Sequence, residues 1–193
     1  MVSIARVNIW NTFVGAVAWD DSRGYATFEY DPDFLKKGWD ISPLTMSMED
    51  ASTGNSIFSF PTLNIETYKG LPGMLADSLP DKYGNKLIET WLARNGRDAS
   101  SFNPVERLCY TGKRGMGALE YEPVTNAFDD TSRPVEIEKL VRLAKDVLND
   151  RKDFTASMNN DGLLDIIRVG TSAGGARAKA IIAYMDERSP DEY

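Results

Sequence analysis

The sequence predicts an α+β protein whose first part is an antiparallel β-meander or small barrel with packed helices. Near the N-terminus, three short segments alternate apolar and polar residues with the period of two that is typical of half-buried strands. From about Thr67 the apolar residues recur with helical spacing instead. A second change of pattern follows a polar stretch after residue 125. We therefore expect two units, residues 1–125 and residues 126–193.

The expected strands begin at the N-terminus and are separated by turn residues. In the first, Ala5, Val7 and Ile9 alternate with polar neighbours. The cluster from Asp20 to Gly24 predicts a turn between the second and third strands. A short helical turn ending at Gly38 and a further strand at Leu44–Met48 should follow. The first three strands are expected at Ala5–Trp10, Val14–Trp19 and Tyr25–Tyr30.

The helical part of the first unit is divided by proline and glycine. Pro80 should break the first helical stretch, and the Asn95-Gly96 pair should end the helix that follows, since glycine adopts the left-handed conformation easily. Pro104 can open another helix that ends before Gly112. A strand at Gly117–Pro123 then completes the first unit.

The second unit begins with the clearest helical pattern in the chain. A polar linker is expected at Asp129–Pro134, and Pro134 suits the first turn of the helix that follows it. The polar segment Asn149–Gly162 predicts a surface loop, and Ala178–Met185 is apolar enough to form a strand. One apolar stripe marks the helix: Ile137, Leu140, Val141, Ala144, Val147 and Leu148.

Composition excludes several classes of function. The chain of 193 residues has no histidine, which excludes a Ser-His-Asp triad and histidine-ligated metals within it. Its one cysteine, Cys109, cannot form a disulfide within the chain and is expected to be a small buried hydrophobe. The net charge of -7 disfavours direct binding of nucleic acid. With neither a signal peptide nor a run of about 20 apolar residues, a cytoplasmic protein that does not enter membranes is expected.

The strongest local motif is the small-residue segment from Gly170 to Lys179. Its glycines allow successive backbone N–H groups to form an anion-binding nest, and Ser172 adds a hydroxyl. It is not a Walker motif, because Ala176 stands where a lysine is needed. From the residues alone, a phosphate-binding loop and a merely flexible turn both remain open.

A second motif runs from Leu71 through Pro80 to Asn85. Asp77 or Ser78 is expected to cap a helix end, with Pro80 interrupting the helical pattern. Asp77 and Asp81 are four residues apart, but aspartates beside a proline are usually solvated turn residues rather than an acid–base pair. We therefore expect no catalytic role for them.

Taken in order, four segments resemble the HipA family of serine/threonine kinase toxins. They are Phe28–Pro32, Leu75–Asp81, Gly112–Leu119 and the Gly-Gly-Ala-Arg-x-Lys run that ends at Lys179. The sequence departs from this pattern at Ala76, where some relatives have proline, and at Arg114, where some have aspartate. The resemblance implies that residues 126–193 begin a kinase-like N-lobe that carries a glycine-rich loop.

In this family the loop covers the phosphates of ATP, and autophosphorylation of a serine in it inactivates the kinase. The matching serine is Ser172, and a phosphate there would add about -1.5 to -2 charges to a loop that binds phosphate. The ATP-phosphate site would comprise Gly170, Ser172, Ala173, Gly174, Gly175, Ala176 and Lys179.

The family's catalytic and metal-binding residues lie beyond Tyr193, so we expect no catalytic residue in this chain and no kinase activity from it alone. ATP and Mg²⁺ are expected only in the complete kinase. The implied partner is a HipB-like DNA-binding antitoxin, and the complete enzyme would phosphorylate a protein. One alternative is a stand-alone, antitoxin-like subunit that binds a separate kinase; another is an unrelated β-rich binding protein.

Overall fold

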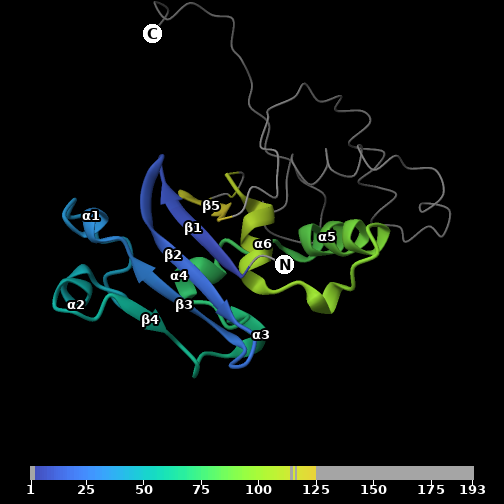
Figure 1. The fold of residues 1–193 in the computed structure, drawn as a ribbon, viewed down its shortest axis with the longest axis horizontal. Helices are drawn as coiled ribbons and strands as arrows, with labels where there is room; N and C mark the ends of the chain where they lie inside the picture. Colours follow the sequence, from blue (N-terminus) through green and yellow to red (C-terminus); the bar gives the residue numbers. More distant parts are fainter. Residues whose placement is uncertain (1–2, 114, 116, 125–193) are drawn as a thin grey trace, which may run out of the picture.

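The protein's first unit is built around one five-stranded antiparallel sheet (Figure 1). The computed structural model describes residues 3–113, 115 and 117–124. Strands follow the order β4-β3-β2-β1-β5, so the first four form a meander and β5 adds beside β1. The sheet is open, with β4 and β5 at its edges, and the predicted α+β meander is confirmed for this unit. The strands are β1 (Ile4–Ile9), β2 (Thr12–Asp20), β3 (Tyr25–Tyr30), β4 (Ile57–Ser59) and β5 (Leu119–Pro123).

Short helices fill the connections between β3 and β5. Pro104 lies in the first turn of a helix, as predicted, Pro32 does the same in α1, and Gly96 has a φ of 68° just after α5. Side chains of Asp31, Ser47, Asn64, Asp81 and Asn103 cap helix N-termini. The helices are α1 (Pro32–Leu35), α2 (Met48–Ser52), α3 (Ile65–Tyr68), α4 (Gly73–Ala76), α5 (Lys82–Arg94), the 3₁₀ helix η1 (Ala99–Ser101) and α6 (Pro104–Thr111).

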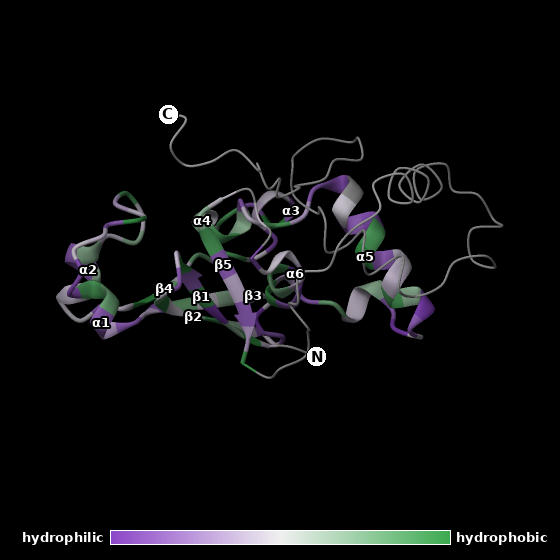
Figure 2. Cartoon of the chain, turned by 90° about the horizontal axis from the view of Figure 1, so that it is seen from above, coloured by the Kyte–Doolittle hydropathy of each residue, from purple (hydrophilic) through white to green (hydrophobic). Residues whose placement is uncertain are grey.

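The core lies on one face of the sheet. Alternate residues of the strands are buried there against α4 and α6, and the hydrophobic colouring of α4 in Figure 2 agrees with this position. This alternation explains why the sequence pattern located β1, β2 and β3 correctly. The core face includes Ala5, Val7, Val17, Phe28, Tyr30 and Tyr121 from the strands, with Leu75, Val105, Leu108 and Cys109 from the helices.

A bulge in β2 and a close approach of the backbone fix the pairing of the central strands. The register of β1 against β2 shifts between Val7 and Asn8, so Val7 pairs with Gly15 and Asn8 with Phe13. A Cβ at Gly15 would lie 2.1 Å from the backbone oxygen of Glu29 on β3. Only glycine therefore permits this contact between β2 and β3.

The turn between β1 and β2 is unusual because it contains a tryptophan. Trp10 and Asn11 both have positive φ, 47° and 61°, as in a type I′ turn, where glycine and asparagine are preferred. The Trp10 ring contacts Trp39 edge to face with centroids 6.1 Å apart, and Trp39 packs in turn on buried Phe34. These ring contacts offset the backbone strain of a large residue at this position.

One expectation for this region was wrong. Leu44–Met48 is not a strand: its chain turns, and Ser47 caps α2, with Met46 fully buried and Leu44 95% exposed. The hydroxyl of Ser47 accepts from the Asp50 N–H, so a local cap takes the place of strand pairing. The strand next to β3 is instead β4, which has three residues. Of the two forms expected for the sheet, a meander or a small barrel, the described residues form the open meander.

Candidate functional site

The predicted phosphate-binding residues lie outside the described part of the chain. Gly170, Ser172, Ala173, Gly174, Gly175, Ala176 and Lys179 therefore remain predictions, as do the helix from Pro134 and the strand at Ala178–Met185. The other three motifs singled out in the sequence fall within the described unit, apart from Arg114 and Met116.

The Leu75–Asp81 segment meets residues on either side of the Gly112–Leu119 segment at a cluster of three hydroxyl groups, here called the hydroxyl junction: Ser78, Thr111 and Tyr121. The Tyr121 hydroxyl donates to Ser78 Oγ at 2.8 Å, and the Thr111 hydroxyl donates to the Ser78 carbonyl oxygen at 3.2 Å. Thr111 and Tyr121 are almost completely buried. The junction joins the segment between α4 and α5 to the end of α6 and to β5.

The electrostatics of the junction favour a structural role. Burial raises the pKa of Tyr121 well above that of a free tyrosine, against an opposing effect of its hydrogen bond to Ser78. Tyr121 therefore remains a protonated hydrogen-bond donor at neutral pH. The chain has no histidine that could act as a general base for Ser78.

The aspartates of the same segment serve as helix ends. Asp81 Oδ1 accepts from the Gly84 N–H at 2.8 Å and caps α5. Asp77 is the C-terminal cap residue of α4, but Ser78 does not cap a helix with its side chain. The structure thus places the capping side chain at Asp81, while Ser78 belongs to the hydroxyl junction.

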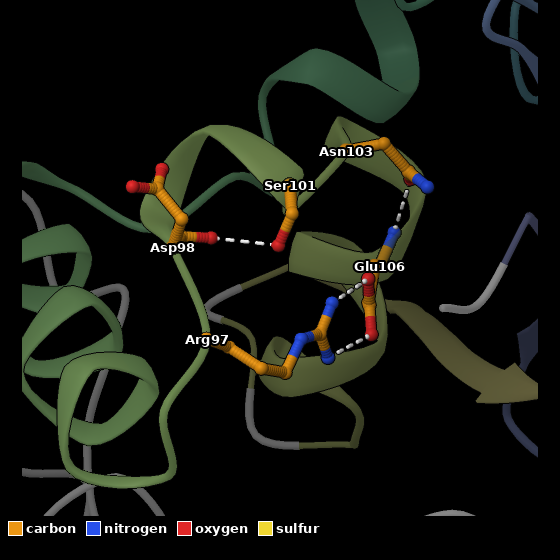
Figure 3. Close-up of polar contacts among 5 residues, drawn as sticks. All are labelled: Arg97, Asp98, Ser101, Asn103 and Glu106. Carbon is orange, nitrogen blue, oxygen red and sulfur yellow. Dashed lines mark hydrogen bonds and ion pairs between the residues drawn. The ribbon is translucent and has the colours of Figure 1, made fainter.

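A second polar network, which the sequence patterns did not indicate, anchors the loop before α6 (Figure 3). Arg97 donates to both carboxylate oxygens of Glu106, at 2.9 and 3.0 Å. Glu106 is 2% exposed, and its N–H donates to the Asn103 side chain at 2.9 Å. The pKa of Arg97 is raised, mainly by its hydrogen bonds to Glu106. Arg97 and Glu106 therefore attach the loop at 95–103 firmly to α6.

Phe102 and Arg107 extend this network toward α5. The guanidinium groups of Arg97 and Arg107 each lie 5.4 Å from the centre of the Phe102 ring. Arg107 also donates to the Asn85 side chain at 2.6 Å, and burial lowers the pKa of its guanidinium. These contacts hold α5 and α6 together with the loop between them.

Cys109 is buried in the core, as expected from composition. Burial raises the pKa of its thiol to about 12, so the thiolate is scarce at neutral pH. Within residues 3–113, 115 and 117–124 we find no group of three or more cysteine or acidic side chains that could hold a metal ion. In the same residues, no helix is long and apolar enough to cross a membrane.

Comparison with known families identifies this unit. A model of the HipA N-terminal domain matches residues 5–122, more than half of the chain. The chain belongs to the HipA N-terminal domain family. The match begins and ends within the five-stranded sheet and includes the hydroxyl junction and the Arg97–Glu106 pair. No match was found among the curated proteins compared.

Membership in the HipA N-terminal domain family confirms the resemblance read from the sequence and associates the chain with HipA-like components of toxin–antitoxin systems. Three of the four ordered segments lie within the match, and the glycine-rich segment follows it in the sequence. The division at residue 125 remains a prediction.

The hydroxyl junction predicts a measurable effect on stability in this HipA N-terminal domain. Tyr121→Phe should lower the free energy of unfolding by about 1 kcal/mol, because it removes one buried hydrogen bond while keeping the ring. Tyr25→Phe is a matched control, since Tyr25 is a partly buried strand tyrosine with no hydrogen bond from its hydroxyl within the described unit. Urea denaturation of both variants and of Ser78→Ala measures the effect. Equal losses for Tyr121→Phe and Tyr25→Phe would contradict a junction formed by this hydroxyl.

Proposed function

We propose that the chain is the N-terminal part of a HipA-like serine/threonine protein kinase toxin. It contributes a docking surface for a partner and the glycine-rich loop that holds the phosphates of ATP. The observation that carries the proposal is the HipA N-terminal domain at residues 5–122, followed in order by the segment from Gly170 to Lys179. The partner is a HipB-like antitoxin or a separate kinase subunit.

The described unit is suited to support and docking. Several of its buried polar groups form hydrogen bonds that join elements of the fold, in the hydroxyl junction and in the Arg97–Glu106 pair. Its lone cysteine is buried with a raised pKa, and it carries no histidine. The chemistry of phosphoryl transfer, which needs metal ligands and a catalytic aspartate, is assigned to a kinase core supplied by further sequence or by a second protein.

Phosphorylation of Ser172 tests the proposed function. The chain incubated alone with Mg-ATP should remain unmodified and bind ATP no more tightly than millimolar, because one loop supplies only part of a phosphate site. With the kinase core present, in the same polypeptide or as a separate subunit, mass spectrometry should detect phosphate on Ser172.

The control variant is Ser172→Ala, which should remove the phosphate, while Thr171→Ala should leave it. Phosphate on Thr171, or nowhere in the loop, would refute the regulatory role of Ser172. Micromolar ATP binding by the isolated chain in calorimetry would show that the nucleotide site is more complete than proposed.

A further inference from the structure

The sheet face opposite the core is partly exposed and carries a distinct set of side chains. We call it the open face and define it by Ile4, Ala16, Ala18, Thr27, Glu29 and Ile57. The register places these residues on adjoining strands β1 to β4 with the orientation opposite to that of the buried core residues. Ile4 is 45% exposed and Ile57 is 54% exposed, although both lie within strands. The helices that bury the sheet, α4 and α6, pack on the other face.

The open face has a low centre between larger side chains. Ala16 and Ala18 on β2 and Thr27 on β3 are short, whereas Ile4 and Ile57 extend from strands on either side of them. Three strand spacings of about 4.8 Å separate β1 from β4, a width of roughly 14 Å. An α-helix with its side chains is about 10–12 Å across, so one helix fits over the small residues between the two isoleucines.

Among the described residues around the open face, three glutamates outnumber two cations. Glu29 lies on it, and Glu120 and Glu122 occupy the same face of β5, as shown by their pairing with Asn8 and Arg6. Glu122 is paired with Lys113 at 3.4 Å, but neither Glu29 nor Glu120 forms an ion pair with any residue of the described unit. Besides Lys113, the described part of this face carries Arg6, whose guanidinium lies 4.2 Å from the centre of the Phe13 ring.

From this juxtaposition we propose that the open face binds a basic amphipathic α-helix of a partner protein. Its apolar side would cover Ala16, Ala18 and the two isoleucines, and its lysine or arginine residues would lie beside Glu29 and Glu120. A second copy of the chain is a poorer occupant, because it would bring the same glutamates against each other. This helix-binding site is the partner-docking surface named in the proposed function, and it rests on that proposed function.

The test uses a fluorescent helical peptide of about 18 residues, or five turns, with leucine on one side and lysine along its flanks. Fluorescence anisotropy with the full chain should show saturable binding that weakens as salt is added. Replacing the flanking lysines with glutamate should abolish binding. Hydrogen-exchange protection on binding should be confined to β1–β4.

Charge-reversal variants decide where the peptide binds. Glu29→Lys combined with Glu120→Lys should weaken binding at least about tenfold. Glu49→Lys combined with Glu66→Lys makes the same change of net charge at exposed helical positions away from the sheet, and should leave the affinity unchanged. Ile57→Thr keeps a β-branched residue and should weaken binding by a smaller factor.

Equal affinities for the two double variants, equal binding of the acidic peptide or no binding would overturn the proposal. The proposal would also be overturned if the chain self-associates and the Glu29→Lys, Glu120→Lys double variant changes that self-association, because a second copy would then occupy the face. Phosphorylation of Ser172 is measured separately, so failure of helix docking and failure of the kinase role can be distinguished.

Discussion

Gly15→Ala should destabilise the fold by about 3 kcal/mol or more, the largest effect we expect from adding a single methyl group. The added Cβ would lie 2.1 Å from the Glu29 carbonyl oxygen and 3.0 Å from Tyr30 Cα, both backbone atoms of β3 that cannot rotate away. Alanine is otherwise favoured over glycine within a strand by roughly 0.5–1 kcal/mol. If Gly15→Ala is destabilised, the cost of the steric clash exceeds the gain in free energy from the lower backbone entropy of the unfolded alanine variant.

The matched control is Gly117→Ala. No heavy atom lies within 4 Å of the Cβ position at Gly117, and its φ is not in the left-handed region, so its stability should change by no more than about 0.5 kcal/mol. Urea denaturation followed by circular dichroism compares the two variants. A Gly15→Ala protein as stable as the wild type would show that β2 and β3 are not this close.

Arg97→Ala should lower the free energy of unfolding by about 3 kcal/mol. The substitution leaves the Glu106 carboxylate, 2% exposed, without the guanidinium that donates to both of its oxygens. Arg97→Lys should recover only part of the loss, because an ammonium cannot reproduce the two-point contact. Denaturant midpoints at constant salt provide the measurement.

Two comparisons separate this explanation from a general loss of packing. Lys36→Ala removes the exposed ion pair with Asp33 and should produce no measurable change. The double variant Arg97→Met with Glu106→Met should be less destabilised than Arg97→Ala, since it leaves no buried charge unpaired. If the double variant were the less stable of the two, the cost of an unpaired carboxylate would not be the cause.

Local pattern predicted those parts of the fold in which one face of an element is buried. Ala5, Val7 and Ile9 revealed β1 because they are buried apolar residues that alternate with the polar residues Arg6 and Asn8, and Pro104 and Gly112 bounded α6 correctly. Leu44–Met48 misled because alternation over five residues also arises in a capped turn, where Leu44 is exposed. The three residues of β4 are too few for any periodicity to be visible.

The polar networks could not be predicted because they join residues that are distant in sequence. Ser78 and Tyr121 are separated by 43 positions, and no composition or spacing rule relates them. Arg97 and Glu106 are nine apart, one in a loop and one on a helix, so no helical repeat aligns them. The segment from Gly170 to Lys179 differs from these networks, because its local composition alone suggests a phosphate-binding role. It lies outside the described residues.

The pairing of β5 with β1 affects the order in which the chain can fold during synthesis. Strand β1 finds β2 within a few residues, but its other neighbour lies more than a hundred positions away. Until residue 123 has left the ribosome, one edge of β1 therefore has unpaired N–H and C=O groups and can pair with other chains. A polypeptide that ended before Leu119 would keep that edge permanently, and we expect it to aggregate.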